Sequence, residues 1–320
     1  MNNNWHSHRF FAMGCNMGVW LETESQARAE QAFAMVVDAF EQAEQRMSRF
    51  RVDSELSWLN AQTNCWAELS PPMWNVIIKA LILAEETNGL FDPTLHDALL
   101  AAGYGRSFKE LNGQGANTLL ADLQRGDRQQ IALDPEARAI CLPEGVRLDL
   151  GGIGKGFTAQ TVVDWLTEWG PCLIDAGGDL TAGDAPADMP GWPVGIGAPW
   201  DERQAERSNL MRLWLANGSL ATSGIDYRKW QQGDGVAHHI IDPRTGISAE
   251  TDILTCSVIS ADACYAEAWA TATIIAGVQD GYNALLERQF PGAIIDQTYT
   301  ITLTPHMAAR IQLEKELVTI

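Results

Sequence analysis

Apolar residues recur at helical spacing in two stretches of the N-terminal third of the chain. The first stretch is otherwise polar, and its apolar positions predict a helix of roughly twenty residues that buries one face and ends near Ser48. These positions are Phe33, Val36, Val37, Phe40 and Met47. Over 70–89, a serine, an early proline, an apolar run and a closing Asn-Gly predict a second helix. Residues 10–21 predict a single strand ahead of both helices.

Strand patterns dominate the second half of the chain. Residues 146–150 predict a strand, 151–156 a glycine turn and 157–169 a helix, and a further helix is expected over 261–276. Short strands are expected at 172–175, 192–197, 211–216, 218–221, 237–241, 253–260 and 299–303, with a closing helix after them and loops over 103–135 and 181–191. This order of strands and helices predicts an α+β or mixed α/β layout.

The length of 320 residues suits one large domain or two tightly joined halves, because single cores stop growing at roughly 250–300 residues. The 22 basic and 41 acidic side chains give a formal net charge of −19, which repels polyanions. Nucleic acid and anionic membranes are therefore poor partners. A phosphate-bearing ligand would need a metal ion, a helix N-terminus or a local basic residue to offset this charge.

The six cysteines are scattered with no C-x-x-C pair, so the sequence predicts neither a zinc site nor a disulfide framework. The first residues lack the charged and apolar regions of a signal peptide, and no later run approaches the ~20 apolar residues of a membrane helix. We therefore expect a cytoplasmic protein without membrane insertion, or a periplasmic one if a leader precedes this sequence.

The first candidate for chemistry is the glycine-rich segment 149–156, between a predicted strand and a predicted helix. Its glycines let the backbone approach a ligand, and the helix N-terminus that follows can face a phosphate. A P-loop is excluded because Asp149 and Gly156 stand at two of its defining positions, and Ala159 replaces the last glycine of G-x-G-x-x-G. A turn that only lets the helix pack on the strand is the alternative, although Asp149 and Lys155 favour a binding site.

The second candidate is the pair His238 and His239, which precedes a turn over 242–246 with proline where its fixed φ fits. Neighbouring strand residues point to opposite faces, so one histidine is expected to face a site and the other solvent or the core. Histidine is the natural general base near neutral pH. A purely structural role is the alternative for either residue.

The third candidate is the pair Glu267 and Thr271, four residues apart on one face of the predicted helix 261–276. Their oxygens can bind a hard cation such as Mg²⁺, with waters and substrate phosphates completing the octahedron. The alternative is that Thr271 bonds a carbonyl of the preceding turn. Two small-residue turns, one followed by Asp226-Tyr227-Arg228 and one before Cys15, are weak signals alone.

Taken together in this order and spacing, these segments resemble the FAD:protein FMN transferases, the ApbE family. Residues 11–15 resemble its A-M-G-T, 48–57 its S-R-Y-x-x-D-S-E-L-S, 89–94 its G-x-F-D-P-T, 149–156 its D-L-G-G-I-A-K-G and 175–179 its x-x-G-G-[ND]. Residues 221–224 match A-T-S-G, 239–246 match H-I-I-D-P-x-T-G, and 266–272 stand where the family has A-D-A-x-x-T-A. The resemblance covers about residues 10–277, and 278–320 are expected to complete a single ApbE-like domain over 1–320 with strands and a helix.

The resemblance implies an α+β, ApbE-like fold, in which mixed or antiparallel sheets with flanking helices form two closely joined halves around a flavin-binding cleft. It implies a Mg²⁺-dependent enzyme that moves the FMN moiety of FAD onto a threonine hydroxyl of a partner flavoprotein and releases AMP. The metal ligands it implies are the Gly152 carbonyl, Glu267 and Thr271, and the implied base that deprotonates the threonine is His239. The positions that match flavin dinucleotide binding are Met13, Phe91, Asp92, Asp149, Lys155 and Ile241.

Two positions depart from the family pattern. Glu267 replaces an aspartate, which moves a metal ligand by roughly an ångström in a geometry that Mg²⁺ does not readily relax. Cys15 replaces a threonine beside the flavin. Two alternatives keep the same motifs: an FAD pyrophosphatase, in which water replaces the threonine and FMN and AMP are released, and an FAD-binding protein without turnover.

Overall fold

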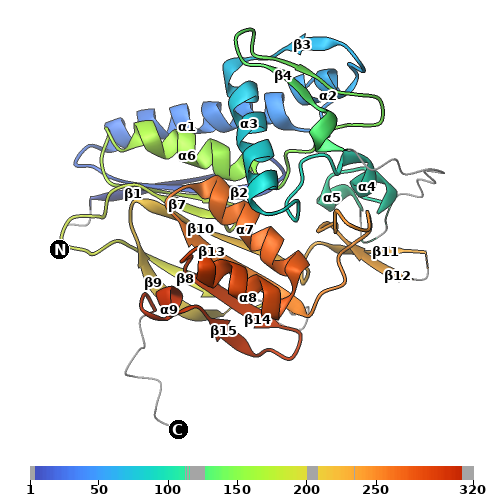
Figure 1. Ribbon diagram of the computed structural model, residues 1–320. Coiled ribbons are helices and arrows are strands. Elements are labelled where there is room, and N and C mark those ends of the chain that lie inside the picture. The colour runs from blue at the N-terminus through green and yellow to red at the C-terminus, as the bar shows by residue number, and fades with distance from the viewer. Residues whose placement is uncertain are drawn as a thin grey trace.

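The computed structural model describes residues 4–111, 113, 115, 127–199, 208–233 and 235–311. Its centre is an eight-stranded sheet in which every neighbouring pair is antiparallel (Figure 1). In spatial order its strands are β1 (Trp5–Ala12), β2 (Cys15–Glu22), β6 (Cys172–Ala176), β7 (Leu180–Ala182), β10 (Gly218–Gly224), β13 (Ile253–Ser260), β14 (Gly292–Asp296) and β15 (Ile301–Leu303). This sheet and its flanking helices confirm the α+β class.

Helices cover one face of the large sheet (Figure 1). Two of them, α1 (Gln26–Met47) and α6 (Gly154–Leu166), share an apolar core with β2 and β6. Two others, α7 (Ala263–Ala276) and α8 (Val278–Glu287), share a core with β13 and β14. Within the described chain, no helix is both long enough and apolar enough to cross a membrane.

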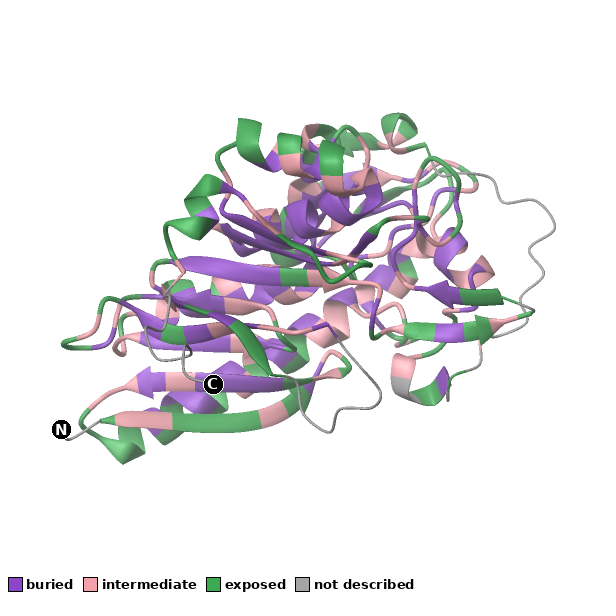
Figure 2. Cartoon of the chain, turned by 90° about the horizontal axis from the view of Figure 1, so that it is seen from below, coloured by how far each residue is buried: buried purple, intermediate pink, exposed green. Residues whose placement is uncertain are grey.

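The opposite face of the sheet packs on a two-stranded sheet formed by β8 (Trp192–Gly197) and β9 (Asn209–Leu215), with α9 (Pro305–Ala308) beside it. Side-chain alternation explains how one strand serves both layers: Ile174 of β6 faces the helices, while its neighbour Leu173 faces β8 and β9. Buried residues therefore follow the inner strands of the large sheet, whereas its edge strands β1 and β15 are mostly half-buried or exposed (Figure 2).

The remaining elements extend one side of the molecule. They are α2 (Glu55–Asn60), α3 (Pro71–Glu86), α4 (His96–Ala101), α5 (Phe108–Leu111), the 3₁₀ helix η1 (Arg128–Gln130), a sheet of β3 (Trp66–Glu68), β5 (Ala139–Cys141) and β4 (Ala132–Asp134), and the hairpin of β11 (Lys229–Gln232) and β12 (Gly235–His238). A core of Leu99, Leu111 and Trp230 joins α4 and α5 to this hairpin. Figure 1 shows the hairpin beside α5, at the same side of the molecule as α4.

The long helices follow their sequence signals. The Ser25 hydroxyl accepts a hydrogen bond from the Arg28 N–H and caps α1, whose buried stripe runs along the predicted apolar face. At the start of α3 the predicted cap is wrong, because the Ser70 hydroxyl donates to the Glu55 carboxylate at 2.6 Å and makes no capping bond. The closing Asn88-Gly89 has positive φ at both residues, as a helix stop requires.

The single strand predicted over 10–21 is wrong, because the chain turns back at Met13-Gly14 to form the hairpin of β1 and β2. Both residues have positive φ, +49° and +73°, and Ala12 pairs directly with Cys15. Such a two-residue hairpin turn needs a left-handed conformation at both positions. The sequence did not predict this turn, because methionine is not one of the residues typical of its first position.

Other boundaries also differ from the prediction. Residues 146–150 form no strand, and the helix predicted to begin at 157 begins at Gly154 because the Gly154 N–H already donates to the Leu150 carbonyl at 2.8 Å. The strand predicted over 237–241 ends at His238, and the loop predicted over 181–191 begins inside β7. The loop predicted over 103–135 contains α5, η1 and β4, and its residues 112, 114 and 116–126 lie outside the described residues.

Candidate functional site

The predicted glycine turn leads into the first turn of α6. Lys155 and Gly156 are already helical, whereas Gly151 and Gly152 are exposed just before the helix. A helix N-terminus carries partial positive charge and N–H groups without helical partners. This end of α6 is therefore suited to an anionic ligand that approaches through the two exposed glycines.

Asp149 fixes the glycine turn to two other parts of the chain. Its Oδ1 accepts a hydrogen bond from the Gly151 N–H at 3.0 Å, and its Oδ2 forms an ion pair with Nε of Arg49 at 2.8 Å. The Asp149 N–H donates to the Pro93 carbonyl at 2.8 Å. Both charged side chains of the ion pair are almost buried, with 12% and 6% exposed for Asp149 and Arg49. The carboxylate thus holds the turn in place.

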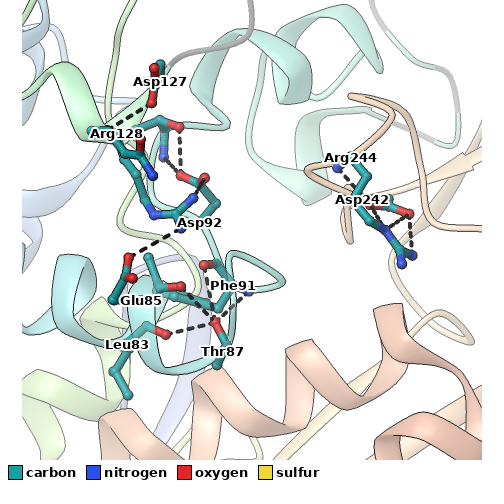
Figure 3. A network of polar contacts seen from close by, with 12 residues as sticks. Leu83, Glu85, Thr87, Phe91, Asp92, Asp127, Arg128, Asp242 and Arg244 are labelled. Carbon is teal, nitrogen blue, oxygen red and sulfur yellow. Dashed lines mark hydrogen bonds and ion pairs between the residues drawn. The ribbon is translucent and has the colours of Figure 1, made fainter.

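Met13 and Phe91 pack against this turn. A Cβ built on Gly152 would lie 3.2 Å from Cε2 of Phe91, and one built on Gly154 would lie 3.5 Å from Cε of Met13. The Phe91 N–H donates to the Thr87 hydroxyl at 3.1 Å, which positions the ring (Figure 3). The structure therefore brings Met13, Phe91, Asp149 and Gly152 together at one place.

Lys155 lies between two carboxylates. Its Nζ is 2.9 Å from Oε1 of Glu267 and 3.0 Å from Oδ2 of Asp179, and the three side chains are only 13%, 6% and 16% exposed. The other oxygen of Glu267 accepts a hydrogen bond from the Gly156 N–H at 3.0 Å, and Oδ1 of Asp179 accepts one from the Thr222 N–H at 3.0 Å. The three groups link α6, α7 and the turn after β6.

The charges in this cluster affect one another. Burial raises the pKa of Glu267, and the Lys155 ammonium opposes that rise. Burial acts to lower the pKa of Lys155, but the carboxylates of Glu267 and Asp179 outweigh burial and raise that pKa above its ordinary value. Lys155 therefore stays protonated, because its two acidic neighbours stabilise the ammonium.

Thr271 lies one turn after Glu267 on α7. In the described structure its hydroxyl pairs with the Ser223 hydroxyl of β10 at 2.9 Å rather than with a carbonyl of the preceding turn. No group of three His, Cys, Asp or Glu side chains gathers among the described residues. A metal ion here would depend on one carboxylate, one hydroxyl and main-chain oxygen, which is the oxygen-only donor set that suits Mg²⁺. Each Glu267 oxygen keeps a lone pair for this purpose.

The two histidines have different surroundings. His238 is buried in β12, and its Nε2 lies 3.1 Å from the Ala249 carbonyl, which indicates a structural role. His239 follows the strand, and its Nδ1 is buried without a hydrogen-bond partner within the described residues. Burial lowers the pKa of His239 well below its ordinary value, and the positive charge of Arg228 and the nearby His238 lower it further. His239 is thus held neutral near Arg228.

Two candidate residues are engaged elsewhere. Oδ1 of Asp92 accepts hydrogen bonds from the N–H and hydroxyl of Thr94, and its Oδ2 lies 3.5 Å from Arg128 (Figure 3). Asp92 still borders the glycine turn, because its neighbour Pro93 accepts the hydrogen bond from Asp149. Ile241 is buried in the apolar core that contains Trp230.

Comparison with known proteins agrees with the resemblance inferred from the motifs. A family model described as the ApbE family matches residues 13–294. The chain belongs to the ApbE family. A curated FAD:protein FMN transferase of Treponema pallidum (strain Nichols) is 32% identical over 287 residues, which cover 84% of this chain and 76% of that protein. Another from Vibrio cholerae serotype O1 is 27% identical and covers 81% of this chain and 77% of its own length.

Solved structures support the same fold for this ApbE-family chain. The crystal structure of the ApbE protein from Thermotoga maritima MSB8 superposes with a TM-score of 0.84 at 21% sequence identity, covering 97% of this chain and all of that one. The structure of the flavin transferase ApbE from Vibrio cholerae gives a TM-score of 0.81 at 21% identity, covering 96% and 99%. At these identities the likeness shows the fold, and it confirms the expected ApbE-like architecture.

Sequence reasoning about this ApbE-family chain missed two arginines. Arg49 pairs with Asp149, donates to the Tyr104 carbonyl at 2.7 Å, and lies over the rings of Phe50 and Tyr104 at 4.1 and 4.6 Å. Arg228 lies close enough to His239 to act on its protonation. Both arginines stand inside segments that the motifs had singled out. An arginine inside a motif of a strongly acidic chain is the signal that could have found them.

Replacing Gly156 with Ala is expected to displace the Glu267 carboxylate, because the new Cβ would lie 2.5 Å from its Oε2. We expect the free energy of unfolding to fall by roughly 1–3 kcal/mol, as in other overpacked sites, and urea denaturation measures it. Gly235→Ala is the matched control, since the nearest atom to its Cβ would be 3.9 Å away, and it should change stability by less than about 0.5 kcal/mol. Equal effects of the two substitutions would contradict the close contact.

Proposed function

We propose that this chain is an FAD:protein FMN transferase that moves the FMN moiety of FAD onto a threonine hydroxyl of a flavoprotein. Its curated relatives in the ApbE family carry that enzyme name. The observation that carries the proposal is the meeting of a half-buried, neutral His239, a protonated Lys155 and the Glu267–Thr271 pair beside an exposed glycine turn. These are the groups that phosphoryl transfer from a pyrophosphate needs.

FAD would bind with its pyrophosphate at the N-terminus of α6. Gly151 and Gly152 leave the backbone accessible there, and the helix end and Lys155 supply positive charge in a chain whose net charge is −19. The sequence motifs place Met13, Phe91, Asp92, Asp149 and Ile241 in the binding of the dinucleotide. Three of these residues, Met13, Phe91 and Asp149, already lie together at the turn, which supports this assignment.

Glu267, Thr271 and the Gly152 carbonyl would hold Mg²⁺, which neutralises part of the pyrophosphate charge when it is bound. The side chains of the protein supply the other parts of the reaction. His239 accepts the proton of the threonine hydroxyl, the threonine oxygen forms a bond to the FMN phosphorus, and the bond from that phosphorus to the AMP phosphate oxygen breaks. In-line displacement of this kind depends on positioning and charge, not on a covalent enzyme intermediate.

The direct test is to incubate the purified chain with FAD, Mg²⁺ and a flavoprotein acceptor, and to separate the nucleotides by chromatography. Transfer predicts AMP release that requires both the acceptor and the metal, so that EDTA stops it. AMP and free FMN formed without an acceptor would establish a pyrophosphatase instead. Intact FAD under all conditions would establish a binding protein without turnover.

Replacing Glu267 with Gln is expected to weaken divalent cation binding by at least roughly tenfold, because the side chain keeps its size but loses the charge that a metal ligand needs. Titration of Mn²⁺, followed by its electron paramagnetic resonance signal, measures this without any turnover. Glu287→Gln on the exposed side of α8 is the control. Unchanged Mn²⁺ affinity in the Glu267 variant would remove this residue from the metal site.

A further inference from the structure

We propose that Arg228 is a substrate-binding residue whose guanidinium contacts the pyrophosphate of FAD during transfer. The proposal rests on the function proposed above and adds a second cation to Lys155. Arg228 ends the Asp226-Tyr227-Arg228 segment between β10 and β11. The proposed transfer reaction assigns no role to this segment. Three features of the guanidinium support the proposal: its position, the charged groups near it, and its few hydrogen-bond partners among the described residues.

The side chain of Arg228 reaches toward the glycine turn. Its Nη2 donates to Sγ of Cys15 at 3.1 Å, and Cys15 begins β2 directly after the turn that holds Met13. Met13 in turn packs against Gly154 at the start of α6. The guanidinium therefore stands beside the place where the candidate dinucleotide-binding residues converge.

Charged groups of the site lie near this guanidinium. It lies within electrostatic range of Asp179, Lys155 and His239, so it is near both the cation and the base of the proposed reaction. A pyrophosphate bound at the N-terminus of α6 would lie close to both Lys155 and Arg228. Two cations of this kind stabilise the charge that spreads over the phosphoryl oxygens in the transition state.

The hydrogen bonds of Arg228 leave it free to bind a ligand. A guanidinium offers five N–H donors, and within the described residues the hydrogen bond of this one goes to a thiol, a weak acceptor. No carboxylate of the described chain forms an ion pair with it within 4.0 Å, and the residue is half-buried. Bidentate pairing with phosphate oxygens is the interaction for which such a planar fork is suited.

Arg49 makes a useful contrast. Its guanidinium is also close to the glycine turn, but it is 6% exposed and its charge is matched by Asp149 at 2.8 Å. It therefore positions Asp149 and the turn. Among the described residues Arg228 has no such acidic partner at contact distance, so its positive charge is available to an anionic ligand.

The experiment compares wild type with Arg228→Met and Arg228→Lys, and uses Arg28→Met on exposed α1 as the matched control. Calorimetric titration with ADP probes the pyrophosphate half of FAD, and titration with riboflavin probes the flavin half without phosphate. We expect Arg228→Met to weaken ADP binding by at least roughly tenfold, to leave riboflavin binding unchanged, and to slow single-turnover transfer roughly 10²–10³-fold. Arg228→Lys should fall between Arg228→Met and wild type, because it keeps the charge but loses the fork.

ADP affinity and transfer rate equal to wild type in both variants would overturn the proposal. Equal losses of ADP and riboflavin affinity would also overturn it, since they indicate a structural role. If Arg228→Met does not fold, as judged by its thermal melting curve, Arg228→Lys decides the question. Failure of the proposed function is distinguished by wild type itself: it would leave every acceptor unmodified and show no acceptor-dependent release of AMP, whatever the ADP titrations show.

Discussion

Replacing His239 with Gln is expected to slow FMN transfer by roughly 10²–10⁴-fold, the usual contribution of a general base. FAD affinity should change by no more than about twofold, because the base acts on the acceptor hydroxyl and not on the bound dinucleotide. The measurement is single-turnover AMP release together with an FAD binding titration. Transfer at the wild-type rate in this variant would remove His239 from the mechanism.

His238→Gln is the matched control for this prediction. His238 is the neighbouring residue, but its ring lies 3.1 Å from the Ala249 carbonyl inside the core of the hairpin. We expect its substitution to lower stability and to leave the rate of the folded enzyme close to that of wild type. A large loss of rate in the His238 variant alone would reverse the assignment of the two histidines.

His239 also sets an expected pH dependence of the transfer rate. His239 acts as a base only when neutral, and its pKa is lowered well below 6.5 by burial, with Arg228 adding to the effect. The acidic limb of the rate profile should therefore lie well below pH 6.5, and Arg228→Met should move it to higher pH. The free energy of unfolding should fall as the pH drops below about 6.5, because His239 then binds a proton in the unfolded chain but not in the folded chain.

Replacing Lys155 with Met is expected to lower the free energy of unfolding by about 3–5 kcal/mol, the usual cost of removing one partner from a buried ion pair. Two nearly buried carboxylates, Glu267 and Asp179, would lose the cation that lies 2.9 and 3.0 Å from them. Transfer should be lost as well, because the pyrophosphate loses a counter-charge. Urea denaturation and the AMP assay measure the two effects separately.

Lys79→Met is the matched control, since Lys79 forms a single ion pair with Asp262 at 2.8 Å but both side chains are 32% exposed. Solvent screens such a pair, so the cost should stay below about 1 kcal/mol. The contrast between the two lysines compares a nearly buried cluster of two ion pairs with one half-exposed pair. Equal losses of stability would show that the Lys155 cluster is screened by solvent and is not a buried charge network.

Sequence periodicity predicted the regular elements well where burial is one-sided or complete. The strands expected over 192–197 and 253–260 coincide with β8 and β13, and the first helix has its expected apolar stripe. It failed where backbone conformation is set by long-range contacts. The strand expected over 146–150 is instead a segment whose Asp149 bonds across to Pro93, and no local pattern encodes that bond.

The candidate site shows the same division. The motifs singled out Asp149, Lys155 and Glu267, and the fold brings these three residues together at the start of α6, as their contacts show. They did not reveal that Lys155 is shared with Asp179, or that Arg228 stands beside His239. Charge neutralisation depends on which side chains come into contact from β6, β10 and α7. These elements are far apart in the sequence, and only the folded sheet brings them together.

Transfer requires that the FMN moiety of FAD becomes covalently attached to a threonine of another protein. Intact mass spectrometry of a flavoprotein acceptor, incubated with this chain, FAD and Mg²⁺, tests it most directly when an acceptor with the target threonine changed to valine is run beside it. We predict that the mass of the native acceptor rises by that of FMN less one water, with one AMP released for each modified chain, and that the valine acceptor stays unmodified. An unmodified native acceptor, in a reaction where FAD has been cleaved to FMN and AMP, would contradict transfer and identify hydrolysis as the reaction.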